Sequence, residues 1–471
     1  MKISDANLKI ILDSRLKKTL EASLYADLRG FKRGLTRISA IASVPSGKSK
    51  GIHEAFVLEP KLALQKFEKI KPQILSREFN SQEEFDNFLI SLDGTPNKQN
   101  LGGNLILALS LAFARLKARV EEKELFQYIR NNFQFSILNF QLPYPIFNVI
   151  NGGVHSGYPK TQINADQDAD KRRYNIRENL CKNQHQSAFL EFQEFQIIPE
   201  VRDFGLALGL GQEFYRKLKE FLEKKFGKEN VFLGDEAGFS CPFKNNEEAL
   251  EILAELIAKY NYPLRIGLDV AASQFYQQPT TNNQQQGYYL INKKSYSAEE
   301  LKNYYLKLIE TYDILSIEDP FYEEGFDDFA SLTADLRRFM RTIEADQRGK
   351  NISVNQRTHQ RQLASILVIT DDLTTTNPER LQTAINKKSG NAILIKPNQI
   401  GTLTETLNVV KLAYENNWQT VVSHRSGETM DDFIADLAVA VNAWGIKAGA
   451  PATPERLVKY ERILKIQSLV Q

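Results

Sequence analysis

The 471-residue sequence has few cysteines and almost no net charge. Neither of its two cysteines, Cys181 and Cys241, lies at the spacing of a metal-binding motif. So little cysteine excludes a disulfide-stabilised secreted fold and is typical of a protein from a reducing compartment. A formal net charge of +2, without a dense block of lysine and arginine, argues against binding to nucleic acid.

Long hydrophobic runs are also missing. The first residues, MKISDANLKIILD, lack the apolar core of a signal peptide, and the runs around Ser110 are too short to span a bilayer. We therefore expect a cytoplasmic protein that does not interact with membranes. Because the chain is longer than one ordinary domain, we expect two domains.

The two parts of the chain follow different patterns. Before residue 60, three runs (LKIIL, TLEASLYADL and LTRISAIASV) alternate like antiparallel strands, and a helical pattern follows up to about residue 130. We predict a smaller α+β domain over residues 1–137. From Pro143, apolar runs recur with helical stretches between them, which predicts an α/β fold with a (β/α)8 barrel over residues 138–471. The expected strands are PIFNVI, FLEFQEFQII, NVFLGDE, LRIGLD, ILSIED, ILVITDD, AILIK and QTVVSHR.

Acidic residues end three successive predicted strands. Asp269, Glu318 and Asp371 would lie close together, because neighbouring strand tips meet at one rim of a closed barrel. Three adjacent carboxylates repel one another unless a cation lies between them, and ligands that are all oxygen favour Mg²⁺. Helix capping is the alternative role for each acid, but it does not explain why the three are adjacent.

Lys396 ends the next strand and is a candidate base. A divalent cation nearby would favour its neutral amine, although a simple ion pair with Asp371 is the alternative. Glu194 and Glu236, at the second and third predicted strands, could share a proton, so that one of them serves as an acid.

Basic residues at the same rim suit a phosphate. The hydrogen-bond donors that could bind a phosphate there are His424, Arg425, Ser426 and Lys447. His155 also follows a strand. The loop PSGKSKG at 45–51 either wraps an anion or is a plain surface connection. Together these groups suit removal of a proton next to a carboxylate, followed by loss of a β-hydroxyl group.

Two segments are rich in polar residues. Tyr158–Ser187 follows His155 at the predicted catalytic rim, and we interpret it as a lid. Glu344–Ser365 lies after a helix and before a strand, so we interpret it as a surface insertion at the opposite rim.

Ten stretches give the chain a specific likeness to a known family. They are PSGKSKGIHEA, FLISLDGTPNK, LPYPIFNVINGGVHSG, GDEAG, IGLDVAAS, SIEDPF, DDLTTTNPERLQTAI, KPNQIGTLTET, VSHRSGET and IKAGAPATPERL. Over nearly its whole length the chain resembles the enolase family. The resemblance implies a Mg²⁺-dependent hydro-lyase (phosphopyruvate hydratase) of glycolysis that converts 2-phosphoglycerate to phosphoenolpyruvate. It also implies a small N-terminal domain, a barrel whose first two strands run antiparallel, and a homodimer or higher homo-oligomer.

The resemblance also implies roles for individual residues. One Mg²⁺ would be held by Asp269, Glu318 and Asp371, and a second, arriving with the substrate, with help from Ser49. Lys396 would be the base and Glu236 the acid. The other catalytic and substrate-binding residues would be His155, Gln193, Glu194, His424, Arg425, Ser426 and Lys447.

Several positions depart from the family pattern. Leu16, Lys17 and Lys18 replace Gly, Asn and Pro in a turn, where we expect an altered conformation and dimer contact. Lys48 and Lys50 add charge to the small-residue loop, Ala237 replaces a glycine, and Gln274 replaces a glutamate. We expect these changes to alter rates without abolishing activity.

Two other functions compete with this prediction. An enzyme of the same superfamily acting on another carboxylate is one, but Ser49, Arg425, Ser426 and Lys447 would then lack a phosphate to bind. An inactive homologue retained as a scaffold is the other, but the predicted base, acid and metal ligands are all present.

Overall fold

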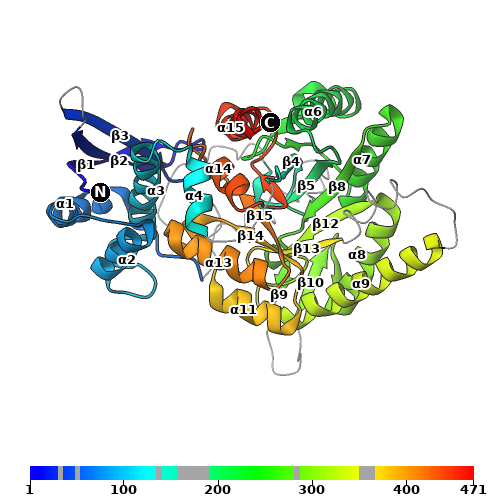
Figure 1. The fold of residues 1–471 in the computed structure, drawn as a ribbon. Coiled ribbons are helices and arrows are strands. Elements are labelled where there is room, and N and C mark those ends of the chain that lie inside the picture. The colour runs from blue at the N-terminus through cyan, green and yellow to red at the C-terminus, as the bar shows by residue number, and fades with distance from the viewer. Residues whose placement is uncertain are drawn as a thin grey trace, which may run out of the picture.

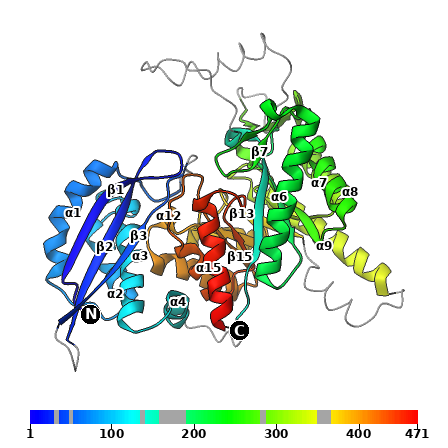
Figure 2. The same ribbon diagram turned by 90° about the horizontal axis from the view of Figure 1, so that it is seen from above.

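A smaller N-terminal part lies beside a barrel in the computed structural model (Figures 1 and 2). The structure describes residues 1–29, 35–47, 53–133, 140–156, 190–279, 287–348 and 366–470. The predicted domain boundary at residue 137 lies outside these ranges, as do Ser49, Lys48, Lys50, Cys181, the segment Tyr158–Ser187 and most of Glu344–Ser365.

The N-terminal part is an antiparallel sheet covered by helices. Strand β2 (Lys18–Arg29) pairs with both β1 (Asp5–Leu12) and β3 (Leu35–Ser43), as the alternating pattern predicts. Helix α3 (Gly103–Val120), which is apolar and almost wholly buried, packs against β2 and β3. The remaining helices here are α1 (Pro60–Leu75), α2 (Gln82–Asp93) and α4 (Leu125–Phe133).

Eight strands of the described residues close into a barrel, because the last strand pairs with the first. In order they are β4 (Tyr144–Asn151), β5 (Glu194–Pro199), β8 (Leu264–Asp269), β12 (Ile314–Glu318), β13 (Leu367–Thr370), β14 (Ala392–Ile395), β15 (Gln419–Ser423) and β16 (Gly445–Lys447). Strand β5 runs antiparallel to both neighbours and the other pairs are parallel, as the family resemblance implies. The predicted α/β barrel is confirmed.

The predicted strand list is wrong at two places. The segment NVFLGDE is not a barrel strand: β6 (Phe232–Leu233) and β7 (Phe239–Ser240) form a short hairpin beside β4. The true last strand, β16, has the sequence GIK. Because it is three residues long and has one large apolar residue, no periodic pattern reveals it.

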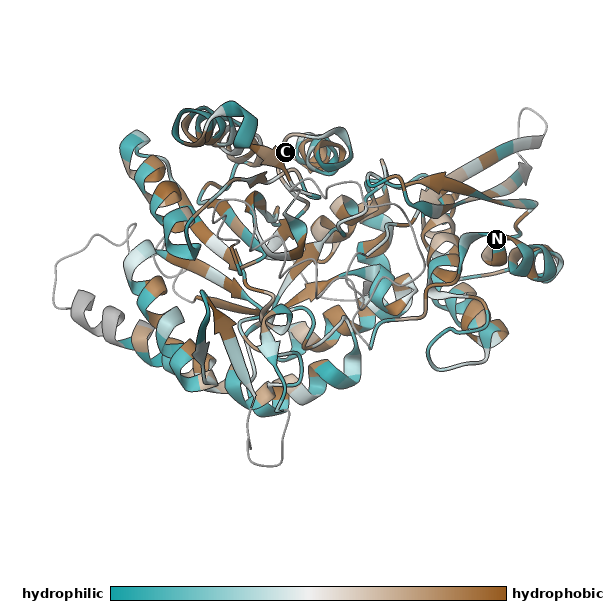
Figure 3. Ribbon diagram, turned by 180° about the vertical axis from the view of Figure 1, so that it is seen from behind, coloured by the Kyte–Doolittle hydropathy of each residue, from teal (hydrophilic) through white to brown (hydrophobic). Residues whose placement is uncertain are grey.

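Helices surround the barrel, and most of them combine apolar and polar residues, coloured brown and teal in Figure 3. Their starts follow local signals. Asn377 accepts hydrogen bonds from the first turn of α11 (Pro378–Lys387), and Ser297 and Glu300 form a capping box at α8 (Ala298–Tyr312). The outer helices are α6 (Phe204–Phe226), α7 (Asn246–Tyr260), α8 (Ala298–Tyr312), α9 (Phe326–Arg348), α11 (Pro378–Lys387), α13 (Leu403–Glu415), α14 (Phe433–Ala440) and α15 (Pro454–Val470).

Short elements complete the fold. They are η1 (Gly153–His155), η2 (Lys228–Asn230), η3 (Ala272–Gln274), β9 (Tyr276–Gln277), β10 (Tyr288–Ile291), β11 (Lys294–Tyr296) and α12 (Pro397–Ile400). No helix in the described part of the chain combines the length and the apolar character that crossing a bilayer requires.

The strand directions bring the candidate site together at one rim. Seven parallel strands of the described barrel end there, and β5, which runs the other way, begins there with Glu194. Apolar side chains from alternate positions of the strands, such as Leu315, Leu367 and Leu394, form a cluster separate from the main core, as expected for the filling of a barrel interior. The rim is therefore built on a packed, rigid base.

Candidate active site

One cavity at this rim collects most of the predicted site residues. Of those that the structure describes, only Glu318 does not line the cavity. The cavity is lined by His155, Gln193, Glu194, Glu236, Asp269, Asp371, Lys396, His424, Arg425, Ser426 and Lys447, together with Glu54, Ala271, Gln274, Asp319, Asp372, Gln399 and Ser423.

Asp269 and Glu318 share the ammonium group of Lys447. They oppose each other on β8 and β12, and Lys447 Nζ lies 2.8 Å from Asp269 Oδ2, 2.8 Å from Glu318 Oε2 and 3.2 Å from Glu194 Oε2. Burial raises the pKa of Glu318 well above its usual value, and the Asp269 charge adds to this. The same burial opposes the charge of Lys447, but the surrounding carboxylates raise its pKa. The carboxylates are thus arranged around a positive charge.

Lys396 forms an ion pair with Asp371, the third predicted metal ligand. The other Asp371 oxygen accepts a hydrogen bond from Gln399 at 3.0 Å. Burial favours the neutral amine, yet the Asp371 carboxylate raises the pKa of Lys396 above its usual value. The ion pair that sequence analysis left open is therefore present.

Asp319 and Asp372 add acidic groups beside Asp371. Burial raises the pKa of both side chains, that of Asp372 to about 7, and repulsion between the three carboxylates adds to the effect. Asp319 already accepts backbone hydrogen bonds from Asp371 at 2.9 Å and Asp372 at 2.7 Å, so it fixes the turn after β13.

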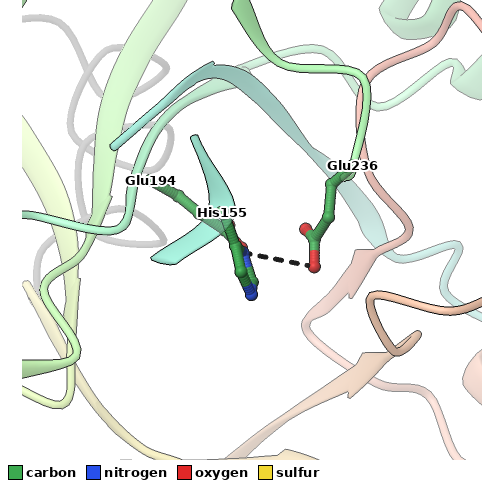
Figure 4. Close-up of side chains that lie close together, drawn as sticks. All are labelled: His155, Glu194 and Glu236. Carbon is green, nitrogen blue, oxygen red and sulfur yellow. Dashed lines mark ion pairs between the residues drawn. The ribbon is translucent and has the colours of Figure 1, made fainter. Parts of the chain in front are cut away.

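His155 lies beside two carboxylates, Glu194 and Glu236, which also line the cavity (Figure 4). Its Nδ1 is 3.5 Å from Glu194 Oε1 and 3.6 Å from Glu236 Oε1. The pKa values of Glu194 and Glu236 are shifted in opposite directions. Burial and the nearby Glu236 charge raise the pKa of Glu194, whereas the adjacent His424 and His155 outweigh burial and lower the pKa of Glu236. Glu194 therefore takes a proton more readily than Glu236.

Arg425 is buried and held by a carboxylate that sequence analysis did not single out. Its two terminal nitrogens contact Glu54 at 2.9 and 3.1 Å, a bidentate arrangement. Burial opposes the Arg425 charge, but Glu54 raises its pKa. The sequence signal for Glu54 is its place just after the small-residue loop, within PSGKSKGIHEA, a stretch that resembles the enolase family.

Two more residues escaped the sequence analysis because they do not lie at strand ends. Asn148, in the middle of β4, donates to Glu236 Oε2 at 3.3 Å. Arg456, in α15, reaches His424 and the carbonyl of Arg425. Complete burial of an arginine cannot be read from a sequence, although Arg456 lies in one of the stretches that resemble the enolase family.

The departures from the family pattern have visible consequences. Leu16 has φ 57° and Ala237 has φ 64°, so both occupy the left-handed region that favours glycine. The Leu16 turn still closes, with hydrogen bonds from Leu16 N to Asp13 O and from Asp13 N to Lys17 O, both 2.9 Å. Gln274 donates to Gln193 and accepts from Val154 N.

The acidic groups suit a metal ion. Within the described residues, two groups have ligand atoms that lie within 4.8 Å of one another: His155 with Glu194 and Glu236, and Asp319 with Asp371 and Asp372. Carboxylate oxygens are the ligands that hard divalent cations prefer. Around Lys447, carboxylates already surround a positive charge. The site can therefore bind metal.

Comparisons with known proteins agree with this geometry. Residues 3–129 match the profile of the enolase N-terminal domain, and residues 177–369 and 340–470 match that of the enolase C-terminal TIM barrel domain. Enolase of Methanocaldococcus jannaschii is 36% identical, covering 99% of this chain and 95% of the relative. Enolase of Pyrococcus furiosus is 36% identical (97% and 92% covered), and enolase B of Dictyostelium discoideum is 35% identical (99% and 95%). The chain therefore belongs to the enolase family of lyases.

Proposed function

We propose that this enolase-family lyase catalyses the reversible, Mg²⁺-dependent dehydration of 2-phosphoglycerate to phosphoenolpyruvate in glycolysis and gluconeogenesis. The supporting observation is that Lys396, Glu236 and Arg425 line one cavity with the acidic cluster. This reaction needs a base, an acid and a hydrogen-bond donor to the substrate phosphate in one place.

Asp269, Glu318 and Asp371 are the proposed ligands of one Mg²⁺, and Ser49 of a second. Bound there, Mg²⁺ would stabilise the negative charge that develops on the substrate carboxylate. For Asp269 and Glu318 to act as ligands, Lys447 has to release them and can turn towards the substrate. Asp371 likewise has to release Lys396, which lowers the pKa of the lysine and leaves the neutral amine that a base requires.

Lys396 and Glu236 carry the proton transfers. The Lys396 amine takes the proton from the α-carbon, and the electron pair of that C–H bond forms the double bond to the β-carbon. The β-hydroxyl leaves as water after it takes a proton from Glu236, whose lowered pKa disfavours the protonated form that this step uses. In the reverse direction, Glu236 accepts the proton of the attacking water, which suits its lowered pKa.

The remaining residues hold the substrate. Arg425 and Ser426 are the proposed hydrogen-bond donors to the substrate phosphate. Glu54 contacts the Arg425 guanidinium group and holds it at the cavity. Gln193, Glu194, His155, His424 and Lys447 surround the rest of the substrate in this proposal. Burial of all of them excludes water, which strengthens their electrostatic interactions.

A direct assay tests this function. The ultraviolet absorbance of the enol product should rise with 2-phosphoglycerate and Mg²⁺ and stop rising when a chelator is added. Loss of a general acid or base costs about 10²–10⁴-fold in rate, so Lys396→Ala and Glu236→Gln should each lose activity on this scale. Lys411→Ala, an exposed change on α13, is the matched control and should keep it. Turnover that persists without metal, or an active Lys396→Ala, would disprove the proposal.

Assembly and location are proposed from the family resemblance. We propose a cytoplasmic homodimer or higher homo-oligomer that acts on a phosphorylated small molecule. Light scattering of the purified protein measures its mass directly, and a mass of 53.8 kDa, that of one chain, would contradict the assembly.

A further inference from the structure

Arg456 lies fully buried between two segments that carry candidate site residues. Its Nη1 contacts Nδ1 of His424 and donates to the carbonyl of Arg425 at 2.8 Å. Its Nη2 donates to the carbonyls of Ser426 at 2.7 Å and Asp235 at 3.0 Å. One guanidinium group therefore joins the strand end that carries His424 to the turn that carries Glu236.

The contact of Arg456 with His424 determines which nitrogen of the His424 ring carries the proton. A guanidinium group has only donors, so the His424 Nδ1 that faces Arg456 has to be an acceptor. The ring proton then resides on Nε2, which lies 3.1 Å from Glu236 Oε2. We propose that Arg456 is a positioning residue that fixes His424 as the neutral tautomer protonated on Nε2 and so directs this N–H at Glu236.

The surroundings of His424 agree with a neutral ring. Burial lowers the pKa of His424 to about 4, and the Arg456 charge acts in the same direction, although Glu236 and Glu428 oppose them. Near neutral pH the ring therefore carries one proton, and Arg456 decides which nitrogen holds it.

The consequence concerns Glu236 and rests on its proposed role as acid and base. Its Oε2 accepts hydrogen bonds from His424 and Asn148, so the same oxygen cannot exchange a proton with the substrate without losing them. The other oxygen, Oε1, faces His155. Arg456, through His424, thus selects Oε1 as the oxygen that exchanges the proton.

Nitrogen NMR of the full-length protein tests the tautomer. The chain has five histidines, so ¹⁵N-histidine labelling gives few signals, and His424→Gln identifies that of His424. We expect a neutral ring protonated on Nε2 throughout the range from pH 6 to pH 8. A proton on Nδ1, or a charged ring in this range, would overturn the inference. The spectrum needs no turnover, so its result is independent of whether the proposed function holds.

Variants of Arg456 test its control of the tautomer. Arg456→Lys keeps a donor towards Nδ1 and should keep the tautomer, whereas Arg456→Met should let both neutral forms appear. If Glu236 acts as proposed, kcat of Arg456→Met should fall about tenfold with a smaller change in KM. An unchanged tautomer in a folded Arg456→Met, checked by circular dichroism, would overturn the inference. If Arg456→Met does not fold, loss of the Nε2 tautomer in a folded Arg456→Lys would do so.

Discussion

Gln274 shows how one hydrogen-bond donor can decide the orientation of a site residue. The Asp269 carboxylate only accepts, so Gln193 presents its amide nitrogen to Asp269, at 3.2 Å, and its oxygen to Gln274. In this chain, Gln274 supplies the donor for the Gln193 oxygen. In Gln274→Glu, the carboxylate can still accept from Val154 N but cannot donate to Gln193. We expect kcat/KM to fall about tenfold at pH 8 through this unmade hydrogen bond.

Protonation of the new side chain should reverse this loss, because a carboxylic acid has one donor. The ratio of kcat/KM in Gln274→Glu to that of the unmodified protein should therefore rise as pH falls from 8 to 6. Gln274→Met, which removes both contacts, is the control and should show no such recovery. Equal pH profiles for the two variants would contradict the argument.

Leu16 has a left-handed backbone conformation that is unfavourable for a residue with a Cβ atom. It has φ 57° in an exposed turn, where a Cβ costs about 1–2 kcal/mol and glycine costs about 0.5–1 kcal/mol of chain entropy. We expect Leu16→Gly to stabilise the protein by about 1 kcal/mol, measured as a shift in the urea midpoint. Leu12→Gly, at an exposed position in strand β1, should destabilise it, and a lower midpoint for Leu16→Gly would refute the role of strain.

Substitutions at two glycines of α6, Gly209 and Gly211, can distinguish the effect of helix propensity from that of packing on the barrel. A Cβ at Gly211 would overlap the buried ring of Phe147 on β4, whereas a Cβ at Gly209 would meet no described atom within 4 Å. Alanine favours a helix over glycine by about 1 kcal/mol, but overpacking a core costs about 1–3 kcal/mol. We expect Gly209→Ala to raise the melting temperature and Gly211→Ala to lower it. Equal shifts would show that α6 does not pack tightly on the barrel.

Asp86 connects the two parts of the molecule and should make stability depend on pH. This buried α2 residue accepts hydrogen bonds from Thr404 N at 2.9 Å and Thr404 Oγ1 at 2.6 Å, at the start of α13. Burial raises the pKa of Asp86 to about 6, despite these hydrogen bonds. Because the folded state holds the proton more tightly than the unfolded chain, the stabilising contribution is complete below about pH 4 and is lost as pH rises through about 6.

Asp86→Asn should remove this dependence. Between pH 4.5 and 7.5, the stability of the unmodified protein relative to Asp86→Asn should decline by about 2 kcal/mol. Urea unfolding at several pH values measures the difference. A constant difference across this range would mean that Asp86 keeps the same charge in both states.

The sequence by itself determined the fold class and most of the rim, for a physical reason. Strands covered on both faces need continuous apolar runs, so Asp269, Glu318 and Lys396 stand out where such runs end. The stretches that resemble the enolase family added the reversed second strand, which no periodicity reveals. Leu16 and Ala237 could be identified as substitutions, but their positive φ angles appear only in the structure.

Tertiary structure alone decided what surrounds these residues. Closure of the barrel depends on β16, which is too short for a pattern. The contacts of Glu54 with Arg425 and of Arg456 with His424 join distant segments, and no sequence pattern shows them. Burial and neighbouring charges then set the opposite pKa shifts of Glu194 and Glu236. Local patterns record which face of an element is apolar, whereas a contact between distant residues exists only once the chain has folded.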